Sequence, residues 1–311
     1  MSTILISEFM HRPSVDVLIS QHQVHYDPQL VDKPDELSTR INGCDALIVG
    51  NRTRVDGTLL DQAGPQLKVV GRLGVGLERI DLGACALRGV TVIPALGCNS
   101  NTVAEYVITA TMMLLRGAYQ CSEEVLAGTW PRIKYTGNEI TGKTLGIFGF
   151  GAIGTRTAFK ANALGMRVLA CDPYVAASDP AWSEFGANRV SHDQLLSQSH
   201  AVSLSVPLTE ETYHLIGTSE IANMLKGSVL INSSRGGVVD ETALCSALRS
   251  GHLAGAMLDV YENEPLAANS GLIGVENLIL TPHIAGVTQE SSQRTGEMIA
   301  QEVSNVLMGN S

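Results

Sequence analysis

The sequence is poor in aromatic residues and in positive charge, and it contains no long apolar run. Phe, Trp and Tyr make up 5% of its 311 residues, and 21 Lys and Arg stand against 31 Asp and Glu, a formal net charge of −10. Phosphate binding needs clustered Lys and Arg, so a nucleic-acid partner is not expected. A membrane-spanning helix needs about 20 consecutive apolar residues. No stretch of that kind occurs, so a membrane partner is not expected either.

The cysteines form no recognisable pattern of pairs. All six are scattered without CxxC spacing, which indicates neither a disulfide framework nor a zinc site, and no metal is expected. The chain enters an apolar run at residues 3–6 without the basic and long apolar regions of a secretory leader. Both features are typical of a protein of the reducing cytoplasm, which is where we expect this one.

What the sequence does contain is a regular alternation of short apolar runs and polar helical stretches. Hydrophobic residues make up 44% and charged residues 17%, as in compact globular proteins, and the length favours two domains. The alternation predicts parallel strands separated by helices. The predicted strands are residues 4–6, 46–49, 68–71, 90–93, 144–149, 167–171, 201–206, 229–232, 255–260 and 278–280, and the predicted long helices are 102–116 and 289–307. We therefore expect an α/β fold with two doubly wound parallel-sheet domains.

A glycine fingerprint stands where the first strand of the second series meets a helix. Residues 149–154 read Gly-Phe-Gly-Ala-Ile-Gly and match GxGxxG. Gly149 permits the tight turn, Gly151 lets the backbone approach a pyrophosphate, and Gly154 allows close packing of helix on strand. The helix N-terminus adds amide donors and partial positive charge for the anion. The motif predicts a dinucleotide cofactor.

The strand after the fingerprint ends in Asp172, 23 residues after Gly149. An acid about 20 residues past the first glycine reaches the adenosine ribose 2′-hydroxyl, and it would repel a 2′-phosphate. The next residues, Pro173 and Tyr174, supply no positive charge, so NAD is expected rather than NADP. The alternative is that Asp172 only caps a turn before Pro173.

Three later stretches place polar residues just after apolar strands, at residues 231–237, 259–265 and 281–286. The carboxyl ends of parallel strands are where such sheets build their sites. Together with the fingerprint, these motifs resemble, in order and interval, the D-2-hydroxyacid dehydrogenase family, which includes phosphoglycerate dehydrogenases, glyoxylate and hydroxypyruvate reductases and D-lactate dehydrogenases. The resemblance spans nearly the whole chain. It implies a Rossmann NAD-binding domain, residues 99–285, inserted in a flavodoxin-like substrate domain made of residues 1–98 and 286–311.

The resemblance also implies a catalytic set of Arg235, Glu264 and His283. Reduction of a keto acid needs a proton donor for the oxygen that becomes an alkoxide, and imidazoles titrate in a suitable pH range. His283 is therefore expected to act as general acid in reduction and general base in oxidation. Glu264 would stabilise the imidazolium, and Arg235 would hold the substrate carboxylate through its fork. Taken singly, each residue also has an ordinary interpretation as a surface charge, a turn residue or a structural histidine.

Further contacts are implied by the resemblance alone. Cofactor contacts, besides the fingerprint and Asp172, fall on Ala152, Ile153, Ser233, Ser234, Arg235, Asp259, His283, Ile284, Ala285 and Gly286. The loop whose backbone amides hold the substrate carboxylate matches Leu73, Gly74, Val75 and Gly76; a βα turn that simply needs glycine is the alternative. Family members are usually homodimers through the long helix, and we expect the same here. Thr102 and Glu105 at the start of that helix are typical of a capping box.

Two arginines follow the predicted strand at residues 46–49 and bear on the substrate. Arg52 and Arg54 are two residues apart, so in an extended segment they share a face. Phosphoglycerate dehydrogenases have a similar pair that contacts the substrate phosphate, so the resemblance implies a second anionic group on the substrate. The alternative is one structural salt bridge and one solvated arginine. Arg79 departs from the family pattern, and it either adds positive charge near the substrate or changes only local packing.

The substrate expected first is a small dianionic 2-hydroxy acid such as 3-phosphoglycerate or 3-sulfolactate, followed by hydroxypyruvate or glyoxylate. A different function stays open, because the C-terminal-binding proteins share the fold and the catalytic set and act as non-enzymatic, NAD-responsive corepressors. Their long disordered tail has no counterpart in this sequence. Formate dehydrogenase activity is disfavoured, because formate dehydrogenases have glutamine at the Glu264 position.

Overall fold

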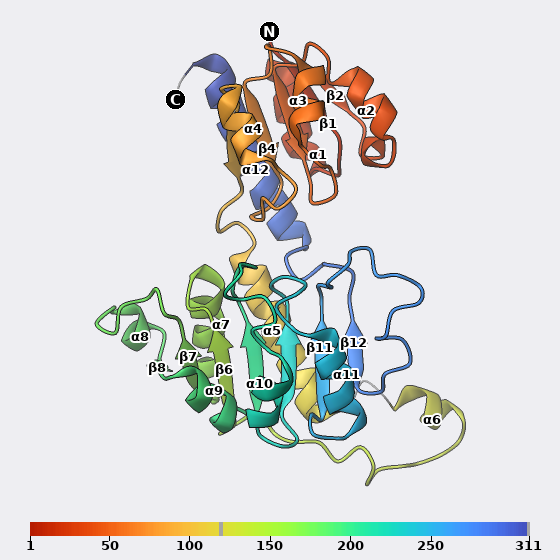
Figure 1. Ribbon diagram of the computed structural model, residues 1–311, viewed down its shortest axis with the longest axis vertical. Coiled ribbons are helices and arrows are strands. Elements are labelled where there is room, and N and C mark those ends of the chain that lie inside the picture. The colour runs from red at the N-terminus through yellow and green to blue at the C-terminus, as the bar shows by residue number, and fades with distance from the viewer. Residues whose placement is uncertain (118–120, 310–311) are drawn as a thin grey trace. The chain divides into compact units, whose positions relative to one another are not determined.

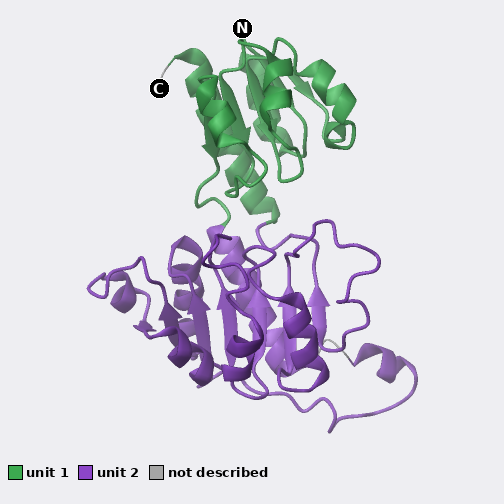
Figure 2. Cartoon of the chain, in the orientation of Figure 1, with its two compact units in different colours: residues 1–99, 287–311 green, residues 100–286 purple. Residues whose placement is uncertain are grey.

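The computed structural model describes residues 1–117 and 121–309 and divides the chain into two compact units (Figures 1 and 2). Unit 1 consists of residues 1–99 and 287–311, and unit 2 consists of residues 100–286. Each unit is built on its own parallel β-sheet. Among the described residues, no helix combines the length and the apolar character needed to cross a membrane.

Unit 1 has a five-stranded parallel sheet with the order β2-β1-β3-β4-β5, which is the flavodoxin-like order. Its strands are β1 (Thr3–Ile6), β2 (Gln23–Tyr26), β3 (Ala46–Val49), β4 (Val69–Arg72) and β5 (Thr91–Pro94). β2 was not among the predicted strands. It lies at the sheet edge and alternates exposed with partly buried residues, so it lacks the apolar run by which the other strands were found.

Helices cover both faces of this sheet, because successive strand residues point to opposite faces. Leu47 packs with α2 (Pro34–Arg40), α3 (Gly57–Ala63) and α4 (Leu82–Leu87), whereas Ile48 packs with α1 (Arg12–Gln21) and α12 (Gln289–Met308). A short 3₁₀ turn, η1, spans Leu30–Asp32. The C-terminal helix α12 lies close on β4, since a Cβ atom at Gly71 would stand 2.8 Å from Ile299. The C-terminal segment therefore belongs to the same unit as the N-terminal hundred residues.

Unit 2 has a seven-stranded parallel sheet with the order β12-β11-β10-β9-β6-β7-β8. From β8 to β11 this is the Rossmann order 3-2-1-4-5-6, and β12 adds one parallel strand beyond it. The strands are β6 (Thr144–Phe148), β7 (Arg167–Cys171), β8 (Ala187–Arg189), β9 (Ala201–Leu204), β10 (Val229–Asn232), β11 (Gly255–Leu258) and β12 (Leu278–Leu280). The three-residue edge strand β8 was not predicted, because two of its residues are exposed and polar.

The helices of unit 2 also lie on both faces of its sheet. Helices α5 (Ser100–Arg116), α7 (Ala152–Ala163) and α8 (Ala181–Glu184) share one core cluster, and α9 (His192–Gln198), α10 (Thr218–Asn223) and α11 (Glu241–Arg249) share the other. A further short helix, α6, spans Ser122–Leu126. Ten of the 17 residues of α5 are buried, which accounts for its apolar composition.

The predicted capping box at the start of α5 is wrong. The helix begins at Ser100, so Thr102 lies inside its first turn and not at the cap position. Glu105 instead forms an ion pair with Lys160 of α7, at 3.1 Å.

Candidate active site

Most predicted site residues follow the carboxyl ends of strands in unit 2. The glycine turn follows β6, residues 233–237 follow β10, residues 259–265 follow β11, and residues 281–286 follow β12. These strands all run parallel in one sheet, so their carboxyl ends share one edge. The topology thus gathers motifs that are more than a hundred residues apart in the sequence.

The glycine turn has the geometry that a bound pyrophosphate requires. Gly149 has φ +85°, and a Cβ atom there would lie 2.3 Å from the Ser205 carbonyl oxygen. A Cβ at Gly154 would lie 2.2 Å from the Gly149 carbonyl oxygen, so this glycine permits close helix–strand packing. A Cβ at Gly151 would meet no atom within 4 Å, and its open side leaves room for a ligand at the start of α7.

Two hydroxyls near this edge of the sheet also suit a nucleotide. The Oγ atoms of Ser205, which follows β9, and Ser233, which follows β10, are buried and have no hydrogen-bond partner among the residues that the structure describes. Buried polar groups normally find a partner, and an unpaired one needs an explanation. A polar cofactor against these strand ends would supply one, so the residues present fit NAD.

Asp172 directly follows β7 and holds the glycine turn. Its Oδ2 accepts a hydrogen bond from the Phe150 amide at 2.7 Å, and its Oδ1 accepts one from the Tyr174 amide at 2.8 Å. The second bond is the turn cap considered as the alternative to ribose binding. The first ties the carboxylate to the fingerprint itself, which places Asp172 beside the expected pyrophosphate turn.

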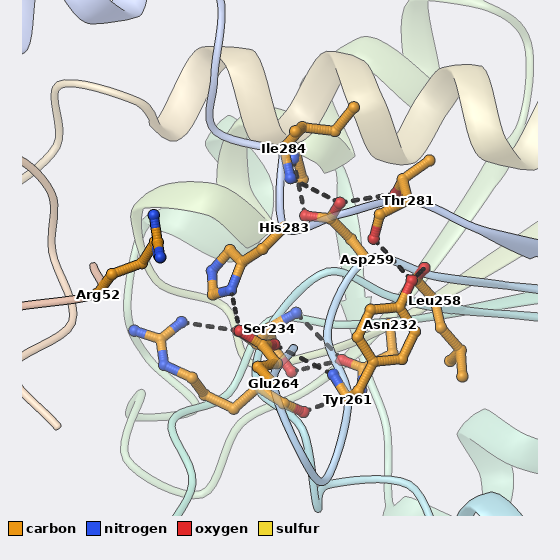
Figure 3. A network of polar contacts seen from close by, with 12 residues as sticks. Arg52, Asn232, Ser234, Leu258, Asp259, Tyr261, Glu264, Thr281, His283 and Ile284 are labelled. Atoms are coloured by element: carbon orange, nitrogen blue, oxygen red, sulfur yellow. Dashed lines mark hydrogen bonds and ion pairs between the residues drawn. The ribbon is translucent and has the colours of Figure 1, made fainter. Parts of the chain in front are cut away.

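His283 and Glu264 form a hydrogen-bonded pair (Figure 3). The His283 Nδ1 lies 2.8 Å from Glu264 Oε2, and about a third of each side chain is exposed. Glu264 Oε1 accepts a further bond from the Tyr261 amide at 3.1 Å. Since a carboxylate only accepts, Nδ1 carries the proton of the shared bond, which fixes the orientation of the imidazole.

The pKa of the Glu264 carboxyl is held below its ordinary value of 4.5. Burial alone would raise this pKa, but the hydrogen bond with His283 and the positive charges of His283 and Arg235 outweigh burial. The carboxylate is therefore ionised throughout the neutral range. The ionised carboxylate accepts the Nδ1 hydrogen bond of His283 and so leaves the Nε2 atom of the ring available.

A buried carboxylate, Asp259, fixes the segment that carries His283 (Figure 3). Asp259 is 1% exposed, and its two oxygens accept bonds from Thr281 Oγ1 at 2.6 Å and from the amides of Ile284 and Ala285, both at 2.7 Å. The Asp259 carbonyl accepts a bond from the His283 amide at 2.9 Å. These contacts hold His283 in a left-handed backbone conformation, φ +58°, which residues other than glycine rarely adopt.

The same network extends to Tyr106 on α5. Its hydroxyl lies 2.5 Å from Thr281 Oγ1. Burial raises the pKa of Tyr106 to about 12, so the hydroxyl keeps its proton. Because Thr281 Oγ1 donates to Asp259, the Tyr106 hydroxyl donates to Thr281. Thr281 opens the motif at residues 281–286, but Tyr106 belongs to no motif, so nothing in the sequence indicates their contact across 175 positions.

The loop that carries Arg235 is held by Asn232, a buried residue of the 231–237 stretch for which the motif predicts no role. The Asn232 side chain donates to the Arg235 carbonyl at 2.9 Å and accepts from the Ser234 amide at 3.1 Å and hydroxyl at 2.8 Å. A Cβ atom at Gly236 would lie 1.6 Å from the Tyr261 carbonyl oxygen. Glycine at this position thus lets the Arg235 loop approach the loop that carries Glu264.

The predicted carboxylate-binding loop lies in unit 1, directly after β4. Gly74 has φ +156°, and its carbonyl accepts a bond from the Ala95 amide at 2.9 Å. The side chain of Arg72 donates from Nε to the Gly76 carbonyl at 2.9 Å and so folds the loop back on the strand end. Val75 stands at the exposed part of this loop.

Comparison with known proteins decides the family. The NAD-binding-domain model of the D-isomer specific 2-hydroxyacid dehydrogenases matches residues 108–285. The chain belongs to this family. It is 51% identical to an (S)-sulfolactate dehydrogenase of Chromohalobacter salexigens over 99% of both chains. It is 38% identical to a D-3-phosphoglycerate dehydrogenase of Archaeoglobus fulgidus over 88% of this chain, although it spans only 52% of that protein, about half its length.

Solved structures of the family agree with this assignment. The apo-structure of D-lactate dehydrogenase from Escherichia coli matches with a TM-score of 0.86 at 27% identity, over 99% of this chain and 98% of that one. A glyoxylate reductase from Paecilomyes thermophila matches with a TM-score of 0.83 at 30% identity, over 98% and 94%. The predicted family, the fold class, the NAD cofactor and the dehydrogenase activity on 2-hydroxy acids are therefore confirmed.

The two arginines of this 2-hydroxyacid dehydrogenase follow β3 and are both exposed. Thr53 between them is 2% exposed, so the two guanidinium groups stand on the solvent side of the segment. Arg52 forms an ion pair with Asp32, and Arg54 Nε lies 3.4 Å from Asp56. Both arginines thus form ion pairs with acidic residues, whereas the alternative interpretation expected one salt bridge and one solvated arginine.

Arg79, the departure from the family pattern, lies beside Arg54. The Val55 amide donates to the Arg79 carbonyl at 2.8 Å, which joins the two segments in parallel. Arg54 and Arg79 both line an open hollow of about 420 Å³, together with three acidic side chains. Arg79 therefore adds positive charge near Arg54 in a hollow whose acidic residues outnumber its arginines.

Proposed function

We propose that this dehydrogenase interconverts (S)-3-sulfolactate and 3-sulfopyruvate. The observation that carries the proposal is its 51% identity to the (S)-sulfolactate dehydrogenase, which extends over nearly all of both chains. The phosphoglycerate dehydrogenase relatives are less similar, and the match leaves about half of each uncovered. 3-Phosphoglycerate is therefore the second candidate, followed by hydroxypyruvate and glyoxylate.

The S descriptor agrees with a D-specific site. In 3-sulfolactate the sulfur-bearing CH₂ group takes precedence over the carboxylate, because sulfur outranks oxygen in the sequence rule for stereocentres. The arrangement that is named R in D-lactate is therefore named S in 3-sulfolactate. A site built for D-2-hydroxy acids accepts the S enantiomer without rearrangement.

In this proposal His283 gives a proton to the substrate oxygen during reduction and takes it back during oxidation. Its Nδ1 is engaged by Glu264 at 2.8 Å, so Nε2 is the nitrogen that faces the substrate. Arg235 binds the carboxylate next to the reacting carbon and polarises the carbonyl. Bound NAD accepts the hydride in oxidation and, as NADH, supplies it in reduction.

Unit 2 is proposed as the NAD-binding domain and unit 1 as the substrate domain. Residues 149–154 take the pyrophosphate, and Asp172 takes the adenosine ribose. The nicotinamide end is assigned to the residues after β10, β11 and β12, namely Ser233, Ser234, Arg235, Asp259, His283, Ile284, Ala285 and Gly286. The support is that all of these follow strand ends at one edge of the sheet.

In unit 1, the two anionic groups of the substrate are assigned to two neighbouring segments. The loop of Leu73, Gly74, Val75 and Gly76 takes the carboxylate, and Arg52 with Arg54 takes the sulfonate. The loop follows β4 and the arginines follow β3, and these strands pair in parallel. Both segments therefore lie at the same edge of the sheet, as a small molecule with two charges requires.

The test is NADH oxidation by the purified protein with 3-sulfopyruvate, 3-phosphohydroxypyruvate, hydroxypyruvate, glyoxylate and pyruvate. The proposal expects the highest kcat/KM with 3-sulfopyruvate. A higher value with 3-phosphohydroxypyruvate would transfer the assignment to the phosphate substrate, and one with glyoxylate would remove the arginine pair from substrate recognition. NADH binding without turnover on any of them would favour the alternative function, that of a non-enzymatic, NAD-responsive corepressor.

A homodimer is proposed as the working form. Segment 121–140 of unit 2 exposes large apolar side chains, with Leu126 88%, Trp130 77% and Ile133 90% exposed, and such groups usually pack against a partner. Light scattering should give twice the monomer mass, and Leu126→Glu with Trp130→Glu should shift it to the monomer. A cytoplasmic location is proposed because the six cysteines are unpaired.

A further inference from the structure

One buried carboxylate organises the segment that presents the two arginines. Glu8 follows β1 and is 7% exposed. Its Oε1 accepts hydrogen bonds from the amides of Gly50 at 2.9 Å, Arg52 at 3.3 Å and Thr53 at 2.8 Å, and its Oε2 lies 3.2 Å from the Arg52 amide. Residues 50–53, which leave β3, are thus wrapped around one side chain.

Gly50 and Glu8 are fitted to each other. A Cβ atom at Gly50 would lie 2.3 Å from Glu8 Oε2, so no other residue at this position leaves the carboxylate in place. A further hydrogen bond joins the segment after β1 to the segment after β3, because Ser7 Oγ lies 3.0 Å from Thr53 Oγ1. The strand ends beneath them are neighbours in the sheet, since β1 pairs with β3.

These contacts decide where the arginines stand. With the backbone of residues 50–53 held on Glu8, Thr53 is drawn inward and is 2% exposed. Residues two apart on an extended segment share a face. The inward anchoring of Thr53 therefore sets Arg52 and Arg54 on the outer face, where a ligand can reach both guanidinium groups.

Removal of the Glu8 carboxylate should destabilise residues 50–53 and leave the rest of unit 1 unchanged. A carboxylate that accepts several amide bonds satisfies buried donors that otherwise have no partner, and freed donors of this kind favour rearrangement of the loop. All four bonds come from backbone amides of one short loop, at Gly50, Arg52 and Thr53. Loss of Glu8 should therefore release this loop while the sheet and its two cores stay intact.

We propose that Glu8 is a positioning residue for substrate specificity, which acts by holding residues 50–53 so that Arg52 and Arg54 bind the second anionic group of the substrate. The inference rests on the proposed function, since it concerns the same anionic group. Glu8 itself touches no substrate. Its removal should therefore weaken the binding of dianionic keto acids and spare both the chemical step and monoanionic keto acids.

The test is a double-mutant cycle with Glu8→Ala, Arg52→Ala and the double variant, assayed with saturating NADH on 3-sulfopyruvate and on glyoxylate. Glu8→Ala should raise KM for 3-sulfopyruvate about tenfold, with kcat within about twofold and KM for glyoxylate unchanged. The double variant should raise KM by less than the product of the two single effects, because Glu8 acts partly through Arg52 and partly through Arg54. Asp35→Ala, an exposed carboxylate in the same unit, is the matched control and should behave as the wild type.

Glu8→Gln serves as the second variant, and it keeps one acceptor oxygen for the amides while it loses the charge and the other acceptor. It should fold and raise KM for 3-sulfopyruvate by less than the alanine variant does, about threefold. Equal KM increases for both substrates, or effects of Glu8→Ala and Arg52→Ala that multiply, would overturn the positioning role. If Arg52→Ala does not raise KM for 3-sulfopyruvate more than KM for glyoxylate, the assignment of the sulfonate to the two arginines is refuted. The proposed role of Glu8 is then refuted as well. If Arg52→Ala is selective and neither Glu8 variant is, only the role of Glu8 fails.

Discussion

Tyr106→Phe tests whether the hydrogen bonds that anchor the His283 segment contribute to catalysis, because it changes this network and none of the proposed catalytic residues. The change removes one hydroxyl and keeps the aromatic ring that packs in the core of unit 2. What is lost is the 2.5 Å contact with Thr281 Oγ1, which in turn donates to Asp259 at 2.6 Å. Asp259 then anchors the amides of Ile284 and Ala285 on the far side of His283.

The size of the effect follows from the type of bond that is lost. A hydrogen bond between neutral groups contributes about 0.5–1.5 kcal/mol, whereas a bond to a charged group contributes about 1.5–3 kcal/mol. Tyr106→Phe should therefore cost about 1 kcal/mol, which lowers Tm by about 2–4 °C in a domain of 150–250 residues. Thr281→Val removes the donor to the buried Asp259 carboxylate and should cost more, about 2 kcal/mol.

The assay is steady-state reduction of 3-sulfopyruvate alongside thermal unfolding. We expect kcat to fall about threefold to tenfold in Tyr106→Phe, with NADH affinity unchanged, because a less firmly held His283 is misplaced for part of the time. The Tyr106→Phe, Thr281→Val double variant should match Thr281→Val alone. Burial raises the pKa of Tyr106 from 10.0 to about 12, so its contribution is complete below pH 10 and is lost as the pH rises through about 12.

An unchanged kcat in both single variants would refute this reasoning, even if both lost stability. Such a result would mean that the network stabilises the fold without controlling His283. Additive losses in the double variant would show instead that Tyr106 acts by a route that bypasses Thr281.

Three further predictions concern the site. Glu264→Gln should lower kcat at least tenfold. It should also remove the acid limb that we expect for the wild type below pH 4.5, because the pKa of the Glu264 carboxyl is depressed and its negative charge is lost as the pH falls through that pKa. An identical acid limb in the variant would assign it to another group. Asp172→Ala should narrow the preference for NADH over NADPH, measured as the ratio of kcat/KM values, and a ratio equal to that of wild type would leave Asp172 only its turn-capping role. Gly236→Ala should abolish activity or folding, because its Cβ would lie 1.6 Å from the Tyr261 carbonyl oxygen, and a folded, active variant would contradict the close approach of the two loops.

The sequence predicted those parts of the molecule whose chemistry depends on a few adjacent residues. The glycine fingerprint led to the confirmed cofactor, NAD, because its glycines answer local requirements, such as the positive φ of Gly149. Strands buried on both faces were found as apolar runs. The edge strands β2 and β8 were missed because an edge strand needs no such run.

The supporting residues could not be predicted, because their roles depend on contacts between distant positions. Glu8 is a single acid after an apolar strand, and its partners lie 42 to 45 positions away. Tyr106 contacts a residue 175 positions away. Thr102 shows the converse error, since its spacing to Glu105 suggests a cap, whereas the helix begins two residues earlier at Ser100.

The most direct test of the central claim is the initial rate of NAD reduction with each enantiomer of 3-sulfolactate. We predict rapid turnover of (S)-3-sulfolactate and at most a trace rate with the R enantiomer, because a D-specific site accepts only the S arrangement of this acid. Preference for the R enantiomer would contradict the family-based stereochemistry. No oxidation of either enantiomer, by protein that binds NAD, would contradict the sulfolactate assignment itself.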